Sequence, residues 1–156
     1  MGVVGAGKTT IGILLAKQCG WEFVDADDFH SRANVEKIRR GIPLDDTDRV
    51  PWLAALHNAI AGWIAKHQNV VLACSALKHS YRAQLRLEPE VKFVHLKGAR
   101  DVIARRLHQR QGHFANDQIL DSQLATLEDP ADAITVDVSA SPEEIVREIR
   151  ARLGLR

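Results

Sequence analysis

The sequence predicts an α/β fold in which helices cover both faces of a parallel sheet, a three-layer α/β/α arrangement. Two observations support this class. Stretches with apolar residues at helical spacing alternate with short, nearly continuous apolar runs along the whole chain. In addition, the stretch GVVGAGKTT (residues 2–10) stands directly before the first helical segment and has the glycine spacing of a phosphate-binding loop, or P-loop.

Seven segments carry the spacing or the end signals of helices. Residues 9–20 have apolar side chains at helical spacing and end in glycine. Ser31 and Ser141 can each cap the helix that follows, and Pro142 suits a first helical position. We therefore predict helices for residues 9–20, 31–41, 50–67, 78–87, 99–114, 117–130 and 141–154.

Four shorter apolar runs predict the strands between these helices. NVVLACSA (69–76) is almost continuously apolar, as expected of a parallel strand that is covered on both faces. The predicted strands are residues 21–28, 69–76, 91–98 and 133–139. Residues 42–52 are predicted as a loop in which Thr47 or Asp48 caps the following helix.

Length and charge limit the classes of protein. The 156 residues fit a single domain, spanning 1–156, that is large enough to bury a core. Lys and Arg number 21 against 20 Asp and Glu, so nothing indicates a nucleic-acid partner. No apolar run is long enough to span a bilayer and no signal peptide opens the chain, so we expect no membrane partner and a cytoplasmic location. Cys19 and Cys74 fit no metal-ligand spacing and are expected as reduced thiols.

The P-loop pattern G-x-x-x-x-G-K-[ST] is matched by residues 2–9. Its glycines let backbone N–H groups surround phosphate oxygens without steric clash, and the following helix adds the positive end of its dipole. Lys8 can reach the β- and γ-phosphates, and the Thr9 hydroxyl can ligate Mg²⁺. A chance glycine turn before a helix is the weaker alternative.

Acidic residues follow the predicted strand 21–28. Asp25 and Asp27 are two residues apart and would share one side if the strand continued through them. One carboxylate would then support hydrated Mg²⁺ while the other met a substrate hydroxyl. The alternative is that Asp25, Asp27 and Asp28 are solvated turn residues.

Together, several segments resemble bacterial gluconokinases over the whole chain. They are GVVGAGKTT, DADDFH (25–30), GIPLDDTDRVPWL (41–53), ACSALKHSYR (73–82), RLHQRQGHF (106–114) and LDSQLATLEDP (120–130). The resemblance implies the fold of P-loop kinases with strand order 2-3-1-4-5. It also implies in-line transfer of the γ-phosphoryl group of ATP, with Mg²⁺, to the primary hydroxyl of D-gluconate, giving 6-phospho-D-gluconate. A homodimer is common among such proteins.

The resemblance also assigns roles to individual residues. The expected catalytic residues are Lys8, Asp27, which contacts the acceptor hydroxyl, and Arg110. The expected Mg²⁺ contacts are Thr9, directly, and Asp25, through a water molecule. The expected ATP site comprises Gly2, Gly5, Ala6, Gly7, Lys8, Thr9, Thr10 and Arg106.

A gluconate site needs a cation for the carboxylate, preferably a forked one, and polar groups for the hydroxyls. Arg49 and Arg82 are the candidates for the carboxylate, and His30 joins Asp27 as a candidate for the hydroxyls. The alternative for Arg49 is an exposed pair with a nearby aspartate, which contributes only about 0–1 kcal/mol. Arg82, taken alone, would be a solvated helix residue.

Arg106 and Arg110 lie one helical turn apart and share a face just before Gly112. We expect them in a lid, about residues 106–118, where one arginine covers the adenine and the other neutralises charge on the transferred phosphoryl group. The alternative is a solvated basic helix face.

The strand that normally precedes a P-loop is reduced here to Met1 and Gly2. Loss of a central strand would leave backbone groups unpaired, at roughly 1–3 kcal/mol for each buried one. We therefore expect a truncated first strand and a natural start several residues upstream. The rival expectation is a short form whose sheet is completed by another chain or not at all.

Two other functions stay open at this point. One is a different small-molecule kinase of the same fold, acting on shikimate or another sugar acid. The other is a nucleotide-binding module without catalysis. Intact Lys8, Thr9 and Asp27 favour the enzyme.

Overall fold

The computed structural model describes residues 1–111 and 115–155. Helices and strands alternate through these residues, as the sequence predicts. The elements are α1 (Lys8–Cys19), β1 (Glu22–Asp25), the 3₁₀ helix η1 (Ala26–Phe29), α2 (Arg32–Arg39), α3 (Asp46–Ala65), β2 (Val70–Ala73), α4 (His79–Leu85), β3 (Val94–Lys97), α5 (Arg100–Gln111), α6 (Ala115–Thr126), β4 (Ile134–Asp137) and α7 (Pro142–Leu153).

The four strands form two parallel pairs. β1 pairs with β2, with Glu22 opposite Val70, and β3 pairs with β4, with Val94 opposite Ile134. In the order 2-3-1-4-5, strand 1 is the strand before the P-loop. The pairs β1–β2 and β3–β4 correspond to strands 2-3 and 4-5, on either side of it. Met1 lies between the pairs, where its nitrogen donates to the Val94 carbonyl and its carbonyl accepts from Leu96 N at 2.9 Å.

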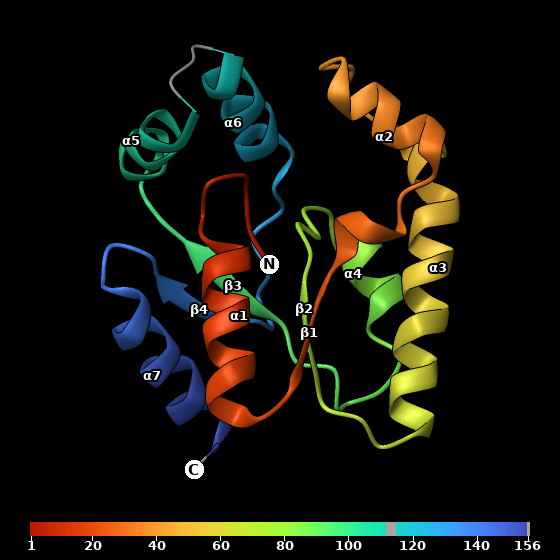
Figure 1. Cartoon of the computed structure of the whole chain (residues 1–156), viewed down its shortest axis with the longest axis vertical. Coiled ribbons are helices and arrows are strands. Elements are labelled where there is room, and N and C mark those ends of the chain that lie inside the picture. Colours follow the sequence, from red (N-terminus) through yellow and green to blue (C-terminus); the bar gives the residue numbers. More distant parts are fainter. Residues whose placement is uncertain (112–114, 156) are drawn as a thin grey trace.

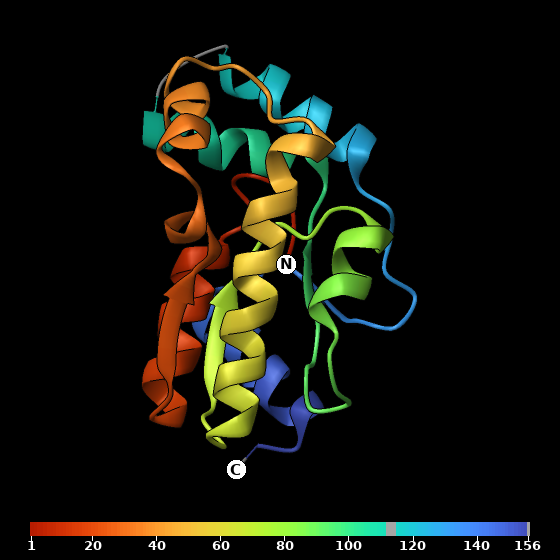
Figure 2. The ribbon, with the colours of Figure 1, turned by 90° about the vertical axis from the view of Figure 1, so that its right-hand side faces the viewer.

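Helices cover both faces of this layer, which confirms the predicted α/β/α arrangement (Figures 1 and 2). On one face, α1 and α7 pack together over the strands, and Leu15, Ile145 and Ile149 belong to the same buried apolar cluster. On the other face, α3 and α4 form a second cluster that includes Leu56 and Leu85. The P-loop and the helices α2, α5 and α6 lie beyond the carboxyl ends of the strands (Figure 1).

Helix α3 begins at Asp46, ahead of the predicted start at residue 50, so the loop prediction is wrong for residues 46–49 and neither Thr47 nor Asp48 is the N-cap. Its N-cap is Asp45, whose carboxylate accepts from Asp48 N at 2.7 Å, while the Asp48 carboxylate accepts from Asp45 N at 3.1 Å. This capping box secures the first turn. Pro51 stands within the helix, where its nitrogen cannot donate a backbone hydrogen bond.

Other helix ends agree with the prediction. Ser31 caps α2 and Ser141 caps α7, with Pro142 in the first turn. Cys19 and Cys74 are free thiols. Of the predicted lid 106–118, residues 112–114 lie outside the described residues. None of the described helices combines the length and the apolar character needed to cross a membrane.

Candidate active site

The P-loop joins the centre of the sheet to the N-terminus of α1. Gly7 is the N-cap of α1, with φ 96°, and Gly5 has φ 78°, both in the left-handed region that favours glycine. A Cβ added at Gly5 would lie 2.6 Å from Cγ of Leu107 on α5. Gly2 N donates to the Ser75 carbonyl at 3.2 Å, and Ala6 N donates within the loop to the Val3 carbonyl at 3.2 Å. The loop therefore has its predicted place and the conformation that glycines allow.

Lys8 folds back over this loop. Its ammonium donates to the carbonyls of Gly2 and Val3, each at 3.0 Å. Burial lowers the pKa of Lys8, and the negative charges of Asp27 and Asp25 partly offset this effect. Lys8 is therefore within electrostatic range of the two carboxylates that the sequence places in the same site.

The two carboxylates do not share a strand face, because β1 ends at Asp25 and η1 begins at Ala26. Asp25 instead caps η1 and accepts from Asp27 N at 2.9 Å. Reduced hydration, followed by the charge of Asp25, raises the pKa of Asp27. The Asp27 side chain is nevertheless 83% exposed, so solvent screens this shift and the carboxylate stays available to a ligand.

His30 lies next to Asp27. Its ring stacks on Trp52 at a centroid distance of 4.7 Å, and its Nε2 lies 4.0 Å from the Asp27 carboxylate. Burial lowers the pKa of His30, and the side chain is only 7% exposed. Within the described residues its buried Nδ1 has no hydrogen-bond partner. The stacking on Trp52 thus holds a neutral imidazole in place, and its Nδ1 is left for a further hydrogen bond.

Arg49 is positioned by α3 and α4 together. Its Nη1 donates to the Leu44 carbonyl at 2.6 Å, and its guanidinium lies 5.7 Å from the ring centroid of Tyr81. The Tyr81 hydroxyl donates to Asp46, which also accepts from Lys78 at 2.9 Å. The hydrogen bond from Tyr81, followed by that from Lys78, lowers the pKa of Asp46. This polar cluster fixes the ring on which Arg49 rests.

The environment of Arg82 differs from that of Arg49. Arg82 is 4% exposed, and it donates to three backbone carbonyls: Ala76 at 2.8 Å, Leu77 at 3.0 Å and Glu128 at 2.8 Å. The expected solvated side chain is therefore buried and bridges two segments far apart in sequence. Its part in carboxylate binding stays a prediction, and Arg49 is the better placed of the two.

Two arginines of α5 contact the start of α1 and the residue after β4. Arg110 Nη2 donates to the Thr10 hydroxyl at 3.1 Å, and Arg106 donates to the Val138 carbonyl. From α6, the Gln123 carboxamide oxygen accepts from Val4 N of the P-loop at 2.7 Å. Helices α5 and α6 thus contact both the P-loop and the start of α1.

The fold and the site define a P-loop kinase that acts on a small molecule: an anion cradle at a helix N-terminus, with an acid, a neutral histidine and an arginine beside it. The shikimate kinase family model matches residues 4–154. The chain is 44% identical to a probable gluconokinase of Xenopus tropicalis, over 98% of this chain and 90% of that protein.

Two bacterial gluconokinases agree. The chain is 44% identical to that of Gluconobacter oxydans, over 96% of this chain and 86% of that protein. The crystal structure of a gluconokinase from Sinorhizobium meliloti superposes with a TM-score of 0.88 at 44% identity, covering 99% of this chain and 89% of that chain. The chain therefore belongs to the gluconokinases within the shikimate kinase family, which confirms the predicted fold and resemblance.

Four hydrogen bonds of this site were not predicted. Tyr81 and Lys78 lie in the segment 73–82 that carries the resemblance, but their common partner Asp46 is visible only in three dimensions. Trp52 donates to the Ala26 carbonyl at 2.7 Å beneath the acids. For the contact of Gln123 with Val4, the sequence offers only the position of Gln123 in the segment 120–130.

Proposed function

We propose that this chain phosphorylates D-gluconate at its primary hydroxyl, using ATP, to give 6-phospho-D-gluconate and ADP. The hydroxyl oxygen forms a bond to the γ-phosphorus, while the bond from that phosphorus to the β–γ bridging oxygen breaks. The hydroxyl proton passes to a nearby base or to water. The transfer is in line and depends mainly on positioning and on charge stabilisation.

One observation carries the proposal: Lys8, Asp27, His30 and Arg49 form one electrostatically coupled row. Lys8 and Asp27 influence each other's pKa, Asp27 lies 4.0 Å from His30, and the charge of Arg49 acts on His30. The row leads from the phosphate loop to a cation, which suits an acceptor with a hydroxyl at one end and a carboxylate at the other. The 44% identity of the chain to gluconokinases supports the choice of D-gluconate.

The nucleotide side would be built from the P-loop and the lid. The loop amides and the N-terminus of α1 would bind phosphate oxygens, and Lys8 would exchange its two carbonyl partners for the β- and γ-phosphates. The oxygen donors Thr9 and Asp25 fit Mg²⁺, which with ATP would neutralise charge on the phosphates. In the proposed lid, 106–118, Arg110 would face the phosphates and Arg106 the adenine.

The acceptor side would be built from η1, from His30 directly after it and from α3. Asp27 would accept a hydrogen bond from the primary hydroxyl and orient it, as an exposed carboxylate can. His30 would hydrogen-bond a further hydroxyl. Arg49 would bind the carboxylate, because within the described residues its Nε and Nη2 have no hydrogen-bond partner, whereas Arg82 donates to three carbonyls.

The first test is ADP release with a panel of acceptors: D-gluconate, shikimate and other sugar acids. Gluconate should give the highest kcat/KM, and product analysis should place the phosphate on the primary hydroxyl. Preference for shikimate would overturn the acceptor assignment. ATP binding without turnover on any acceptor would favour the non-catalytic module.

The role of Asp27 can be tested against its neighbour. Asp27→Asn should lower kcat by about 10²–10⁴-fold with little change in the KM for ATP, because the amide cannot accept the proton. Asp28→Asn is the matched control, since Asp28 is an exposed acid in the same turn of η1. Equal activity of the two variants in the ADP-release assay would remove Asp27 from the mechanism.

A further inference from the structure

The indole of Trp52 on α3 contacts both ends of the short segment that carries Asp27. Its Nε1 donates to the carbonyl of Ala26, the residue directly before Asp27, at 2.7 Å. Its ring stacks on His30, which follows Asp27 by three positions, at a centroid distance of 4.7 Å and an interplanar angle of 13°. One rigid side chain therefore holds the backbone on one side of Asp27 and an aromatic ring on the other.

The segment between these two contacts is a single turn with buried ends and an exposed acid. Ala26 and the side chain of His30 are buried, whereas the side chain of Asp27 is exposed. Within the turn, Asp27 N donates to the Asp25 carboxylate at 2.9 Å, and His30 N donates to the Asp27 carbonyl at 3.2 Å. Because both ends of this turn rest on the indole, the place of the Asp27 carboxylate depends on the place of Trp52.

Trp52 is itself fixed to the body of α3. It is buried in the same apolar cluster as Leu53, Leu56 and Ala26. Helix α3 also packs against α4 and η1. Buried side chains in such a close-packed cluster do not move independently of one another. The position of α3 is therefore transmitted through Trp52 to the acidic turn.

The same part of α3 carries Arg49. Arg49 precedes Trp52 by three positions, which places the two on neighbouring turns of one face, about 4.5 Å apart along the helix axis. The guanidinium of Arg49 is held by the Leu44 carbonyl and by the ring of Tyr81. A single segment of α3 thus presents a cation and, through Trp52, fixes the distance from that cation to the Asp27 carboxylate.

We propose that Trp52 is a positioning residue that sets the separation of Asp27 and Arg49 and thereby selects the length of the acceptor. This inference rests on the proposed function, in which Arg49 binds the acceptor carboxylate and Asp27 its primary hydroxyl. A sugar acid reaches both groups only when the carbon chain between its two ends matches their separation. D-xylonate, which is one carbon shorter than D-gluconate, leaves its hydroxyl short of Asp27 when its carboxylate is bound. A misplacement of about 1 Å lowers the rate about 100-fold.

The indole N–H distinguishes this role from packing alone. A phenylalanine at position 52 keeps an aromatic ring in the apolar cluster and against His30, but it has no donor for the Ala26 carbonyl. Trp52→Phe therefore releases the end of the turn that precedes Asp27. The helix and Arg49 stay where they are, so the separation of the two charged groups is no longer fixed.

The test is the ratio of kcat/KM for D-gluconate to kcat/KM for D-xylonate, measured by ADP release. The ratio should be about 100 in the unmodified chain and about 10 or less in Trp52→Phe, mainly through a lower kcat for gluconate. Trp63→Phe is the matched control, because Trp63 is a partly buried tryptophan further along the same helix and away from the acidic turn. A purely structural role would lower the amount of active enzyme for both acceptors equally and leave the ratio unchanged.

An unchanged ratio in Trp52→Phe would overturn the proposal, as would an equal fall in Trp63→Phe. Hydrogen exchange gives a readout that does not depend on activity. Exchange at the amides of Asp27 and His30 should be faster in Trp52→Phe than in Trp63→Phe, and equal rates would also overturn the positioning role. Failure of the proposed function would be seen separately, as a lack of gluconate turnover by the unmodified chain.

A second pair of variants leaves the indole in place and covers the case that Trp52→Phe does not fold. His30→Phe keeps an aromatic ring stacked on Trp52, whereas His30→Ala removes it, and both lose the polar contacts of the imidazole. The ratio of gluconate to xylonate turnover should stay higher in His30→Phe than in His30→Ala. Equal ratios in the two variants would show that the stacking on Trp52 does not position Asp27, and would overturn the proposal.

Discussion

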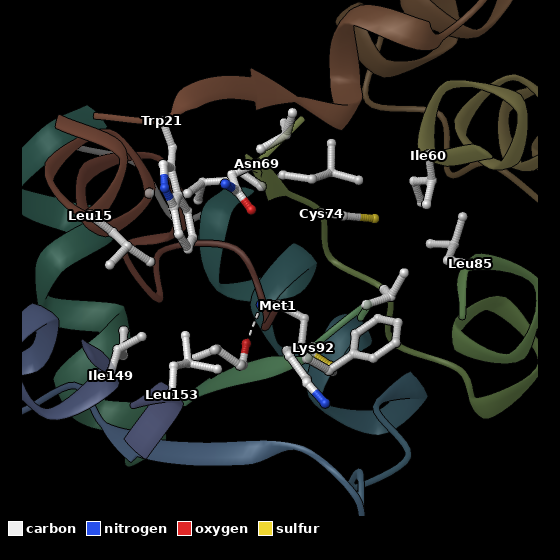
Figure 3. A pocket seen from close by; sticks show the side chains of 18 of the residues that line it. Met1, Leu15, Trp21, Ile60, Asn69, Cys74, Leu85, Lys92, Ile149 and Leu153 are labelled. Atoms are coloured by element: carbon white, nitrogen blue, oxygen red, sulfur yellow. Dashed lines mark hydrogen bonds between the residues drawn. The ribbon is translucent and has the colours of Figure 1, made fainter. Parts of the chain in front are cut away.

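The two ends of the junction between the strand pairs are built differently. At the carboxyl end, backbone and side-chain hydrogen bonds join the halves: Gly2 N to the Ser75 carbonyl, Glu128 N to the Leu77 carbonyl, and Arg82 to the carbonyls of Leu77 and Glu128. Toward the amino ends of the strands, β2 and β3 face each other across an apolar cavity of about 380 Å³ whose lining runs from Met1 and Lys8 to Asn69 and Lys92 (Figure 3). The site therefore lies where the halves are bonded to each other, and the sheet is discontinuous away from it.

This difference matters because each half holds one substrate in the proposed function. Asp27, His30 and Arg49 belong to the half built on β1 and β2, whereas Arg106 and Arg110 belong to the half that contains β3 and β4 (Figure 1). Phosphoryl transfer needs the acceptor oxygen in line with the γ-phosphate, so the relative placement of the halves sets the rate. The bonds at the carboxyl end are then part of the catalytic geometry.

Removal of Arg82 should have the largest effect on this junction. Arg82→Ala leaves the Ala76 and Glu128 carbonyls without this donor, while the Leu77 carbonyl keeps its bond from Glu128 N. At about 1–3 kcal/mol for each carbonyl that stays buried, we expect about 4 kcal/mol of destabilisation in urea unfolding. Arg105→Ala, on the exposed side of α5, is the matched control and should change stability by less than about 0.5 kcal/mol. A stable Arg82→Ala with a raised KM for gluconate would instead make Arg82 a substrate ligand.

The amino group of Met1 should make the junction sensitive to pH. Burial, followed by the charge of Lys8, lowers its pKa from 8.0 to about 5, while Cys74 opposes the shift. Between these values the unfolded chain binds a proton that the folded chain does not, so stability falls as pH drops from 8 to 5, by at most about 4 kcal/mol. Urea unfolding of the chain and of a version acetylated at Met1 isolates this effect, because acetylation removes the titrating amine and leaves every other group. Parallel pH profiles of the two would show that the amine does not titrate in this range.

The P-loop and the halves of the sheet could be predicted because their signals are local. GVVGAGKTT places glycines, Lys8 and Thr9 within one turn and one loop, and each strand is a single apolar run. The start of α3 was missed because Asp45, Asp46 and Asp48 are all suitable caps, and the choice among them depends on the reciprocal bond between Asp45 and Asp48.

The contacts that decide between arginines could not be predicted. Arg82 is buried because the chain returns at Glu128, and Gln123 reaches Val4 across 119 positions of sequence. Spacing on one helix carries no information about either partner. Similarly, Asp25 and Asp27 were expected on one strand face, and only the turn into η1 reverses that expectation.

Substitution of Arg49 should contrast with substitution of Arg82, because the loss of Arg49 should affect gluconate binding more than stability. Arg49→Ala should raise the KM for gluconate about 100-fold, which corresponds to about 2.7 kcal/mol, with the KM for ATP unchanged. Arg49→Lys should recover part of this loss, since it keeps the charge without the fork. Stability should change by about 1 kcal/mol, for the bond to Leu44 and the contact with Tyr81. An unchanged KM for gluconate would move the carboxylate to another cation.

Substitution of Gln123 should give the smallest effect, and we expect it on ATP binding alone. Its carboxamide oxygen fixes Val4 N, so Gln123→Ala should loosen the P-loop and weaken ATP binding about fivefold in a calorimetric titration. Gln118→Ala is the matched control, because Gln118 is an exposed glutamine on the same helix. The sign of the change separates two readings of this contact. Weaker binding means that α6 braces the loop for phosphate, whereas tighter binding means that Gln123 competes with phosphate for the Val4 amide and must leave before ATP binds.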